Sequence, residues 1–197
     1  MSYLLTKTVA APISPVTLAE AKEHLRVDGS FEDAYITGLV SAATYMAEAC
    51  TERQFITATY ALVLNEFPGN ACPVYMPRTP LVAVSSITYT DSSGNAQTLS
   101  TSVYDTLSDD TVARVVLKLD QSWPDTQSGV YGGVTITFTA GYGTATTDAP
   151  ASARSAILMI VGHLFENRES VVVGTIATPI PMGATALLDS ISARTPS

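Results

Sequence analysis

The chain has few of the residues that build metal and disulfide sites. Its 197 residues include two cysteines, Cys50 and Cys72, and two histidines. The cysteines are too few for a disulfide scaffold, and neither belongs to a Cys-x-x-Cys pair, so a structural zinc site is nearly excluded. Two histidines also exclude a His-rich metal centre. We therefore expect no metal and no cofactor.

Positive charge is scarce as well. Ten lysines and arginines, only three of them lysines, stand against 18 aspartates and glutamates, which gives a net charge of −8. A protein that binds nucleic acid on its own needs clustered lysines and arginines to neutralise phosphates. The composition therefore disfavours that class of protein.

Long hydrophobic runs are missing too. The longest apolar run, 156–165, is interrupted by Gly162 and His163, and it is far shorter than the roughly 20 residues that span a bilayer. Residues 1–16 have no basic segment followed by a long apolar one, so they do not resemble a signal peptide. We expect a soluble protein, made in the cytoplasm with reduced thiols and with no membrane partner.

The residues that are present favour a folded domain. The chain is 46% hydrophobic and 14% charged, a balance that supports a sizeable core and disfavours intrinsic disorder. Its length fits one domain, or one domain with an insertion. The sequence shows no internal repeats and no low-complexity tracts.

The N-terminal segment predicts an extended arm followed by a short helix. Residues 1–16 contain two prolines, which favour an extended chain over a helix. Thr17 is a good N-cap, and Glu20 three residues later completes a capping box. This helix is expected to end near Asp28 and Gly29.

A second, longer helix is predicted over 30–50, with Ser30 as its N-cap. Its apolar residues recur at i, i+3, i+4 and i+7 spacing over four turns, which is typical of an amphipathic helix. Cys50 lies in this stripe and is predicted to be buried as a small hydrophobic residue.

Residues 55–140 predict a small antiparallel sheet. Short runs of β-branched and aromatic residues are separated by turn residues, and the alternation over 134–139 is typical of a strand with one buried face. The loops 91–110 and 121–133 are long and polar, and Trp123 is expected to anchor the second one on the sheet. The predicted strands are 59–64, 74–76, 81–90, 113–119 and 134–139.

Helical spacing returns after the glycine-containing turn at 141–143. A helix over 149–168 is apolar on two faces, so it is buried on two sides, and one of those sides can belong to another subunit. A short final helix is predicted over 184–193. Because helices bracket the β-region, we predict an α+β fold, with a helical core of two long helices plus short helices and a small antiparallel β-region inserted between them.

We interpret the whole chain, 1–197, as a single domain. Its predicted parts are the N-terminal arm and helices (1–54), the inserted β-region (55–143), the long C-terminal helix (144–169), and an extended arm with a short terminal helix (170–197).

Sequence motifs for catalysis are absent. The chain has no Gly-x-Ser-x-Gly elbow, and the glycine pair Gly141 and Gly143 lacks the third glycine of a dinucleotide-binding loop. His163 and Glu166 lie three residues apart, but the Glu-x-x-His pattern of di-iron bundles is reversed here and has no second copy. We expect no catalytic residues and no enzymatic activity.

Several short segments nevertheless follow one another in an informative order. They are 15–28 (PVTLAEAKEHLRVD), 51–53 (TER), 76–81 (MPRTPL) with Val84, Ile87 and Tyr89, 134–143 (VTITFTAGYG), 156–159 (AILM) and 162–169 (GHLFENRE). This order resembles that of phage head–tail connector proteins, also called head-completion adaptors and associated with DNA packaging. The resemblance covers nearly the whole chain.

The resemblance implies a structural protein of the virion neck, between head and tail, made in the host cytoplasm. Such adaptors form a homo-oligomeric ring, usually a dodecamer, beneath the portal protein of a filled capsid. They extend the DNA channel and provide the attachment platform for the stopper or tail-completion protein. Genomic DNA passes through the channel without specific binding, which agrees with the acidic composition.

The candidate subunit or portal interface lies in the C-terminal part of the chain. Residues 170–197 contain apolar residues between prolines and glycines, and we predict a docking arm that becomes ordered on the portal. We also expect at least one ion pair between subunits among the charges on 154–169. The candidate interface residues are Arg154, Leu158, Phe165, Glu166, Arg168, Glu169, Val171, Val172, Val173, Ile176, Leu187, Leu188 and Ile191.

The alternative is a non-catalytic protein- or carbohydrate-binding module that uses the Thr-rich β-region as its binding face. This class would need a cluster of exposed aromatic side chains, and the candidates are Tyr89, Tyr104, Trp123 and Tyr131.

Overall fold

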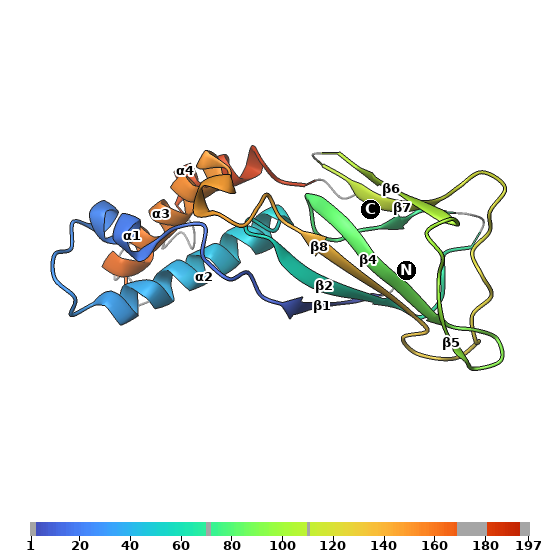
Figure 1. Ribbon diagram of the computed structural model, residues 1–197. Helices are drawn as coiled ribbons and strands as arrows, with labels where there is room; N and C mark the ends of the chain where they lie inside the picture. Colours follow the sequence, from blue (N-terminus) through green and yellow to red (C-terminus); the bar gives the residue numbers. More distant parts are fainter. Residues whose placement is uncertain (1–2, 70–71, 110, 169–180, 194–197) are drawn as a thin grey trace, which may run out of the picture. The chain divides into compact units, whose positions relative to one another are not determined.

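The computed structural model describes residues 3–69, 72–109, 111–168 and 181–193 (Figure 1). Over these ranges the chain is a mixed α+β protein with four α-helices, one short 3-10 helix and two antiparallel sheets. It divides into two compact units. The helical unit comprises Pro12–Ile56 and Tyr142–Ser192, and the strand unit comprises Met1–Ala11, Thr57–Gly141 and Ala193–Ser197.

The helical unit contains two long and two short α-helices. They are α1 (Leu18–Leu25), α2 (Asp33–Thr51), α3 (Ala151–Glu166) and α4 (Met182–Asp189). The 3-10 helix Thr146–Asp148 precedes α3. Helix α2 packs on α3, α1 contacts both of them, and α4 contacts α3 and α2.

Small and branched apolar side chains fill the core of the helical unit. The buried positions of α2 recur at helical spacing, as the sequence pattern predicted, and α3 buries five residues against them. Alanines at many of these positions let the helix backbones approach closely. The buried apolar residues of the four helices are Ala21, Ile36, Val40, Ala43, Ala47, Ala153, Ala156, Ile157, Ile160, Val161, Ala184 and Leu188.

The capping box predicted at the start of α1 is confirmed. The Glu20 backbone N–H donates to Thr17 Oγ1 at 3.2 Å, and the Thr17 N–H donates to Glu20 Oε2 at 2.8 Å. The helix ends at Arg26, which adopts a left-handed conformation with φ 55°. Helix α2 starts later than predicted, at Asp33 after the N-cap Glu32, because the residues from Ser30 onward form a turn first.

The prediction that Cys50 is buried is wrong, since this cysteine is exposed. The buried stripe of α2 ends on Thr51, which is four residues after Ala47 and fully buried. Cys50 lies about 100° around the helix from Thr51 and therefore faces solvent.

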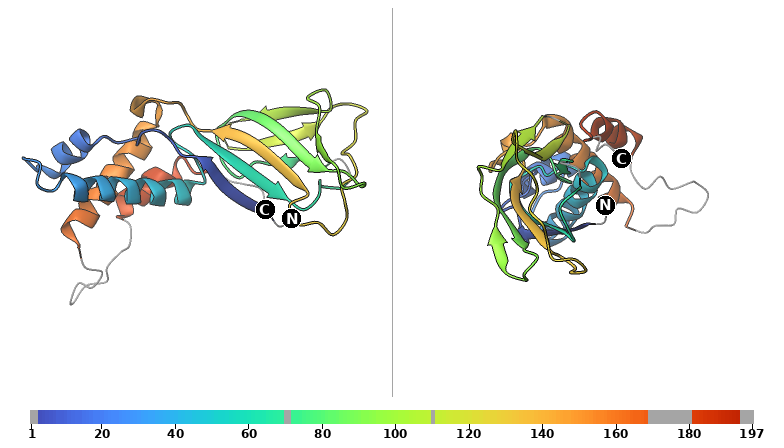
Figure 2. Two further views of the ribbon diagram at one scale, coloured as in Figure 1. Left: turned by 60° about the horizontal axis from the view of Figure 1, so that its bottom comes forward. Right: turned by 90° about the vertical axis from the view of Figure 1, so that its right-hand side faces the viewer.

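The larger sheet of the strand unit has five strands in the order β1-β2-β8-β4-β5, all antiparallel. Figure 2 shows β1 in blue, β2 in teal, β8 in orange and β4 in green, side by side. The strands are β1 (Tyr3–Val9), β2 (Ala58–Leu64), β8 (Val134–Ala140), β4 (Leu81–Thr90) and β5 (Ala96–Thr98).

A smaller sheet has the order β3-β7-β6. Its strands are β3 (Val74–Tyr75), β7 (Ala113–Leu117) and β6 (Tyr104–Ser108). Side chains from both sheets form one hydrophobic core. The central strands β2 and β8 alternate strictly between buried and half-buried residues, as expected for strands with one buried face.

Three strands lie in segments that the sequence did not predict as strands. Strand β1 occupies the predicted extended arm and pairs with β2 along one edge of the larger sheet. Strands β5 and β6 lie inside the predicted loop 91–110. Their residues are mostly exposed, so these strands have no buried face that a period of two could reveal.

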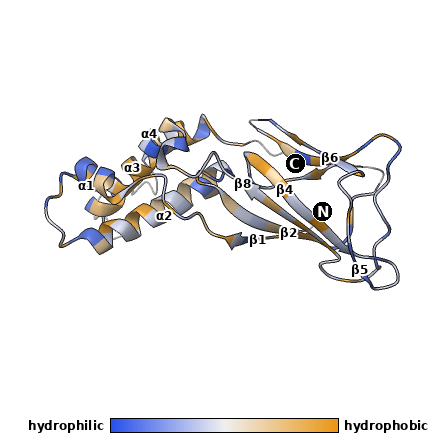
Figure 3. Cartoon of the chain, viewed as in Figure 1, coloured by the Kyte–Doolittle hydropathy of each residue, from blue (hydrophilic) through white to orange (hydrophobic). Residues whose placement is uncertain are grey.

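The hydropathy of β4 does not match its burial at every position. Figure 3 shows a hydrophobic stretch at the start of β4. Within this stretch Val82 is 58% exposed, whereas Ile87 further along the strand is fully buried. The apolar surface of β4 therefore lies partly outside the core of the strand unit.

We expect Phe138→Ala to lower the free energy of unfolding by about 3–5 kcal/mol, because it empties a fully buried site. The Phe138 ring stacks on Tyr60 with centroids 5.5 Å apart. Urea denaturation followed by circular dichroism measures the change. The control Tyr131→Ala, at a position 92% exposed, should change stability by less than about 0.5 kcal/mol. Equal effects of the two variants would contradict the assigned core.

Candidate functional site

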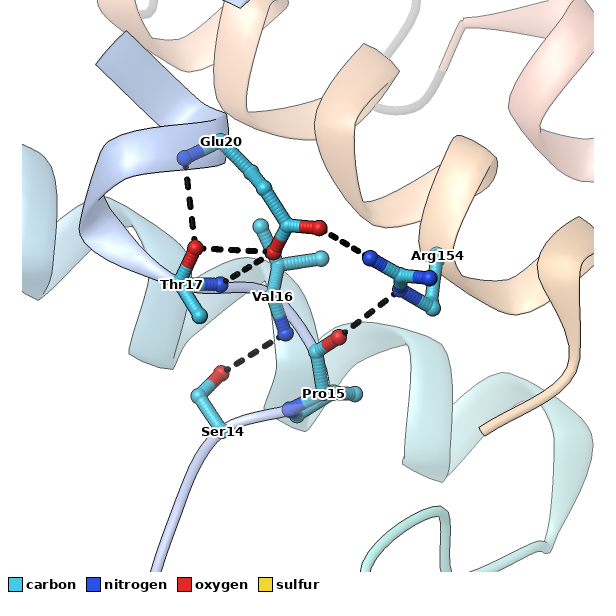
Figure 4. Close-up of polar contacts among 6 residues, drawn as sticks. All are labelled: Ser14, Pro15, Val16, Thr17, Glu20 and Arg154. Carbon is cyan, nitrogen blue, oxygen red and sulfur yellow. Dashed lines mark hydrogen bonds and ion pairs between the residues drawn. The ribbon is translucent and has the colours of Figure 1, made fainter. Parts of the chain in front are cut away.

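A polar cluster joins the segment before α1 to α3 (Figure 4). The carboxylate of Glu20 forms an ion pair with the Arg154 guanidinium and accepts hydrogen bonds from Thr17. Arg154 Nε also donates to the Pro15 carbonyl at 3.2 Å. One arginine on α3 therefore fixes both the cap of α1 and the backbone that leads into it.

These contacts lower the pKa of Glu20 below its ordinary value. The largest cause is the hydrogen bond from the Thr17 backbone N–H, and the Thr17 hydroxyl and Arg154 act in the same direction. Partial burial of the carboxyl opposes them and raises the pKa. The charged form of Glu20 is thus the one that the cluster stabilises.

A second polar cluster is buried at the end of α2. Glu48, Thr51, Arg53 and Gln54 are each less than one-tenth exposed. Gln54 Nε2 donates to Glu48 Oε1 at 2.6 Å, and the same oxygen accepts from the Phe55 backbone N–H at 3.3 Å. This carboxylate therefore fixes the path of the chain just after the helix.

Arg53 connects three segments of the helical unit. Its Nε donates to the carbonyl of Ile191, just after α4, and its Nη1 donates to the Tyr142 hydroxyl at 2.8 Å. Its guanidinium carbon also lies 5.8 Å from the centre of the Tyr142 ring. Sequence reasoning did not identify this function for Arg53, although the residue belongs to the TER segment that carried the resemblance.

Aromatic and charged side chains meet at the end of α3. The Arg168 guanidinium lies 4.8 Å from the Tyr35 ring centre and 5.4 Å from that of Phe165. Arg168 also pairs with Glu32, with 2.8 Å between Nη2 and Oε1. Phe31, adjacent to Glu32, is fully exposed at 101%. Arg168 is therefore a cation fixed on the surface, and the residue before its partner Glu32 is an uncovered aromatic ring.

The structure places the predicted interface residues of α3 and its C-terminal end in different environments. Leu158 and Phe165 are half-buried, and Glu166 and Arg168 are exposed. Arg154 and Arg168 have carboxylate partners within their own chain. The expected ion pair between subunits stays a prediction.

The predicted docking arm stays a prediction, and the structure describes only its residues 181–193. Leu188 is 2% exposed and packs inside its own helical unit, and Leu187 and Ile191 are half-buried. Helix α4 contacts α3 and α2 because its apolar side chains complete their core. Leu188 is therefore not available as an anchor on a partner while α4 is docked. The other residues predicted for the interface, Glu169, Val171, Val172, Val173 and Ile176, lie outside the described residues.

The aromatic residues proposed for a binding module do not form one exposed cluster. Tyr104 is buried, and Tyr131 is exposed at 92%. Trp123 stacks on Phe67, with ring centres 4.9 Å apart, and its Nε1 donates to the Cys72 carbonyl at 3.1 Å. The prediction that Trp123 anchors its loop is confirmed.

The described residues were also compared with the requirements of a metal site and of a membrane span. In the part of the chain that the structure describes, no three His, Cys, Asp or Glu side chains are grouped to hold a metal ion. No helix among the described residues has the length and apolar character to cross a membrane.

Comparisons with known proteins identify the family. A family model described as phage gp6-like head-tail connector protein matches residues 15–119, more than half of the chain. The chain belongs to this family. A comparison with curated proteins gives no match.

Solved structures share the fold. A chain from the neck of an empty GTA particle computed with C6 symmetry has a TM-score of 0.82 and 23% identity, covering 98% of this chain and 97% of that one. A chain from the virion of a native gene transfer agent (GTA) particle has a TM-score of 0.80 at 23% identity, with the same coverage. A chain from the neck of a native GTA particle computed with C12 symmetry has a TM-score of 0.79 and 22% identity, again with coverage of 98% and 97%.

We expect Glu20→Gln to lower the free energy of unfolding by about 1 kcal/mol at pH 7, a typical value for a helix cap. The folded-state pKa of Glu20 is depressed, so its contribution is present above the unfolded pKa and is lost as pH falls through the folded one. The difference between wild type and variant should therefore shrink below about pH 4.5.

Chemical denaturation at a series of pH values tests this prediction. The matched control is Glu23→Gln, an exposed carboxylate on the same helix. A stability difference between wild type and Glu20→Gln that is constant from pH 7 to pH 3 would contradict the assigned role of the charge.

Proposed function

We propose that this chain is the subunit of a structural connector ring in the neck of a tailed phage or a phage-like particle. The observation that carries the proposal is the likeness in fold, over 98% of the chain, to a protein from the neck of a GTA particle. Membership of the head-tail connector family supports the same role. The role is architectural and requires no catalysis.

The proposed ring has twelve copies, in line with the C12 symmetry of one similar neck. Helix α3 supports an interface between neighbours, since Leu158 and Phe165 are half-buried within the chain and Met159 is 41% exposed. A neighbouring subunit would remove the remaining apolar surface from water, which favours association by about 25 cal/mol per Å².

The proposed partners are the portal protein on one side of the ring and a stopper or tail-completion protein on the other. We propose that 1–197 acts as one adaptor, with Glu169, Val171, Val172, Val173 and Ile176 contributing to the subunit or portal interface. The fully exposed Phe31 and the neighbouring Arg168 offer a further contact surface. Electron microscopy of the particle neck with this protein labelled tests the location.

The acidic composition supports a channel that lets DNA slide. Each copy has a formal charge of −8, so twelve copies together carry −96. A wall of this sign repels phosphates, so DNA passes without being held.

We expect Phe165→Ala to impair ring assembly more than it impairs folding. The side chain is only half-buried in its own chain, so the loss of folding stability should stay near 1–2 kcal/mol, below the range for a fully buried phenylalanine. Native mass spectrometry and micrographs of assembled particles measure the ring, and thermal melts measure the fold. Tyr45→Ala, an exposed aromatic position on α2, is the control. An assembled ring in which Leu158 and Phe165 are both solvent-exposed would refute the interface.

We also expect the isolated chain to bind duplex DNA weakly or not at all at physiological salt. Affinity for DNA depends largely on counterions that are released when lysines and arginines neutralise phosphates. With a net charge of −8, this contribution is small. Filter binding at several salt concentrations measures this. Micromolar affinity with a steep dependence on salt would contradict a passive channel wall.

A further inference from the structure

A groove of about 450 Å³ lies on the strand unit. None of its lining residues belongs to the helices that carry the proposed ring interface. Two short segments form its walls, one just after β2 and one between β7 and β8. Aromatic, proline and acidic side chains line it together, among them Glu66, Phe67, Pro68, Trp123, Pro124 and Asp125.

The aromatic floor of the groove is held in place. Phe67 is 7% exposed and packs between Trp123, with nearly parallel rings, and Tyr89, which meets it edge-on at 5.7 Å between centres. The indole N–H of Trp123 donates a hydrogen bond to the Cys72 carbonyl. Trp123 is half-buried and lines the groove, so the face of the indole away from Phe67 is the one that a ligand would meet.

Hydrogen bonds fix the wall that carries Trp123 and the start of the other wall. Gln121 N donates to the Lys118 carbonyl at 3.2 Å, and Gln127 N donates to the Thr90 carbonyl at 3.1 Å, so the wall that carries Trp123 is tied at each end. Beside the other wall, the Asn65 side chain accepts from the Gly132 N–H at 3.2 Å. The groove is therefore a feature of the fold and not of one free loop.

The charge of the groove has one sign. Glu66 and Asp125 are exposed acids that line it, and none of the described residues around it is a lysine or an arginine. Lys118, close by in sequence, already pairs with Asp105 at 3.5 Å and donates to the Thr101 carbonyl. Within the part of the chain that the structure describes, no cation lines the groove beside these two carboxylates.

We propose that this groove binds an extended, positively charged peptide segment of a partner protein. Grooves lined by aromatic side chains bind extended proline-rich segments, which lose little conformational entropy on binding. Trp123 and the two prolines contact apolar or proline side chains of the segment, and Glu66 and Asp125 pair with its arginines or lysines. A neutral sugar would leave both carboxylates unpaired, and a nucleic acid would be repelled by them.

The single tryptophan of the chain makes the proposal directly measurable. The full-length protein is titrated at low salt with a blocked peptide of Arg-Pro repeats, and Trp123 emission is recorded. Peptides of Gln-Pro and Glu-Pro repeats with the same length are the controls. We expect a saturable change with the Arg-Pro peptide that weakens as salt is added, and no saturable change with the other two.

Charge variants separate the groove from the overall acidity of the chain. Glu66→Gln with Asp125→Asn should weaken binding of a fluorescein-labelled Arg-Pro peptide several-fold, and by at most about 25-fold, since each exposed ion pair contributes up to about fivefold. The matched double variant Glu23→Gln with Asp28→Asn removes the same charge from two exposed positions of the helical unit and should leave affinity unchanged.

Three results would overturn the proposal. The first is no change in emission up to millimolar Arg-Pro peptide. The second is equal binding of the Gln-Pro peptide, which would show that charge does not matter. The third is an equal loss of affinity in the two double variants, which would show attraction to the acidic surface as a whole. Thermal melts confirm that each variant is folded. Ring assembly is measured separately, so failure here does not affect the proposed connector function.

Discussion

A buried arginine at the end of α2 closes the helical unit. Arg53 is 5% exposed, and a guanidinium cannot lose its charge in the way a lysine can, so it must find hydrogen-bond acceptors inside the protein. It takes them from Tyr142 and Ile191, which are 89 and 138 residues further along the chain. Arg53 can reach both of these acceptors only when all three segments are in place. The interaction therefore links the end of α2 to the return of the chain from the strand unit and to the docking of α4.

The two halves of the helical unit are also joined by backbone contacts. Tyr142 N donates to the Phe55 carbonyl at 3.1 Å, and Ile56 forms a bridge with Gly143. Beyond these contacts, alanines on α2 and α3 bring the two helices together, and Arg154 holds α1 against α3. Long-range polar contacts thus specify which segments meet, while burial of apolar surface supplies most of the favourable free energy.

Local patterns predicted the elements that have a clear buried face. The capping box of Thr17 and Glu20, the long helix α2 and the alternating strand β8 follow from spacing alone. The edge strand β1 was not predicted as a strand because its side chains are mostly exposed. Hydrogen-bonded pairing with β2, and not burial, defines it. The prediction of a buried Cys50 was wrong because the buried face of α2 shifts around the helix along its length, and the last turn buries Thr51 instead. No local pattern predicts that Arg53 contacts Ile191. The connector function was predicted from the family resemblance and not from the physics of single segments.

The distribution of charge links the fold to the proposed role. Among the described residues, Lys22, Lys118, Arg154 and Arg168 form ion pairs with carboxylates of the same chain, and Arg53 is buried. These cations help to fix helices and loops, and the chain has only ten lysines and arginines in all. The 18 acids outnumber them and extend over both units, including the rims of the Trp123 groove. A net charge of this sign supports the proposed channel, in which DNA is not held, and the proposed binding of a basic segment of a partner protein.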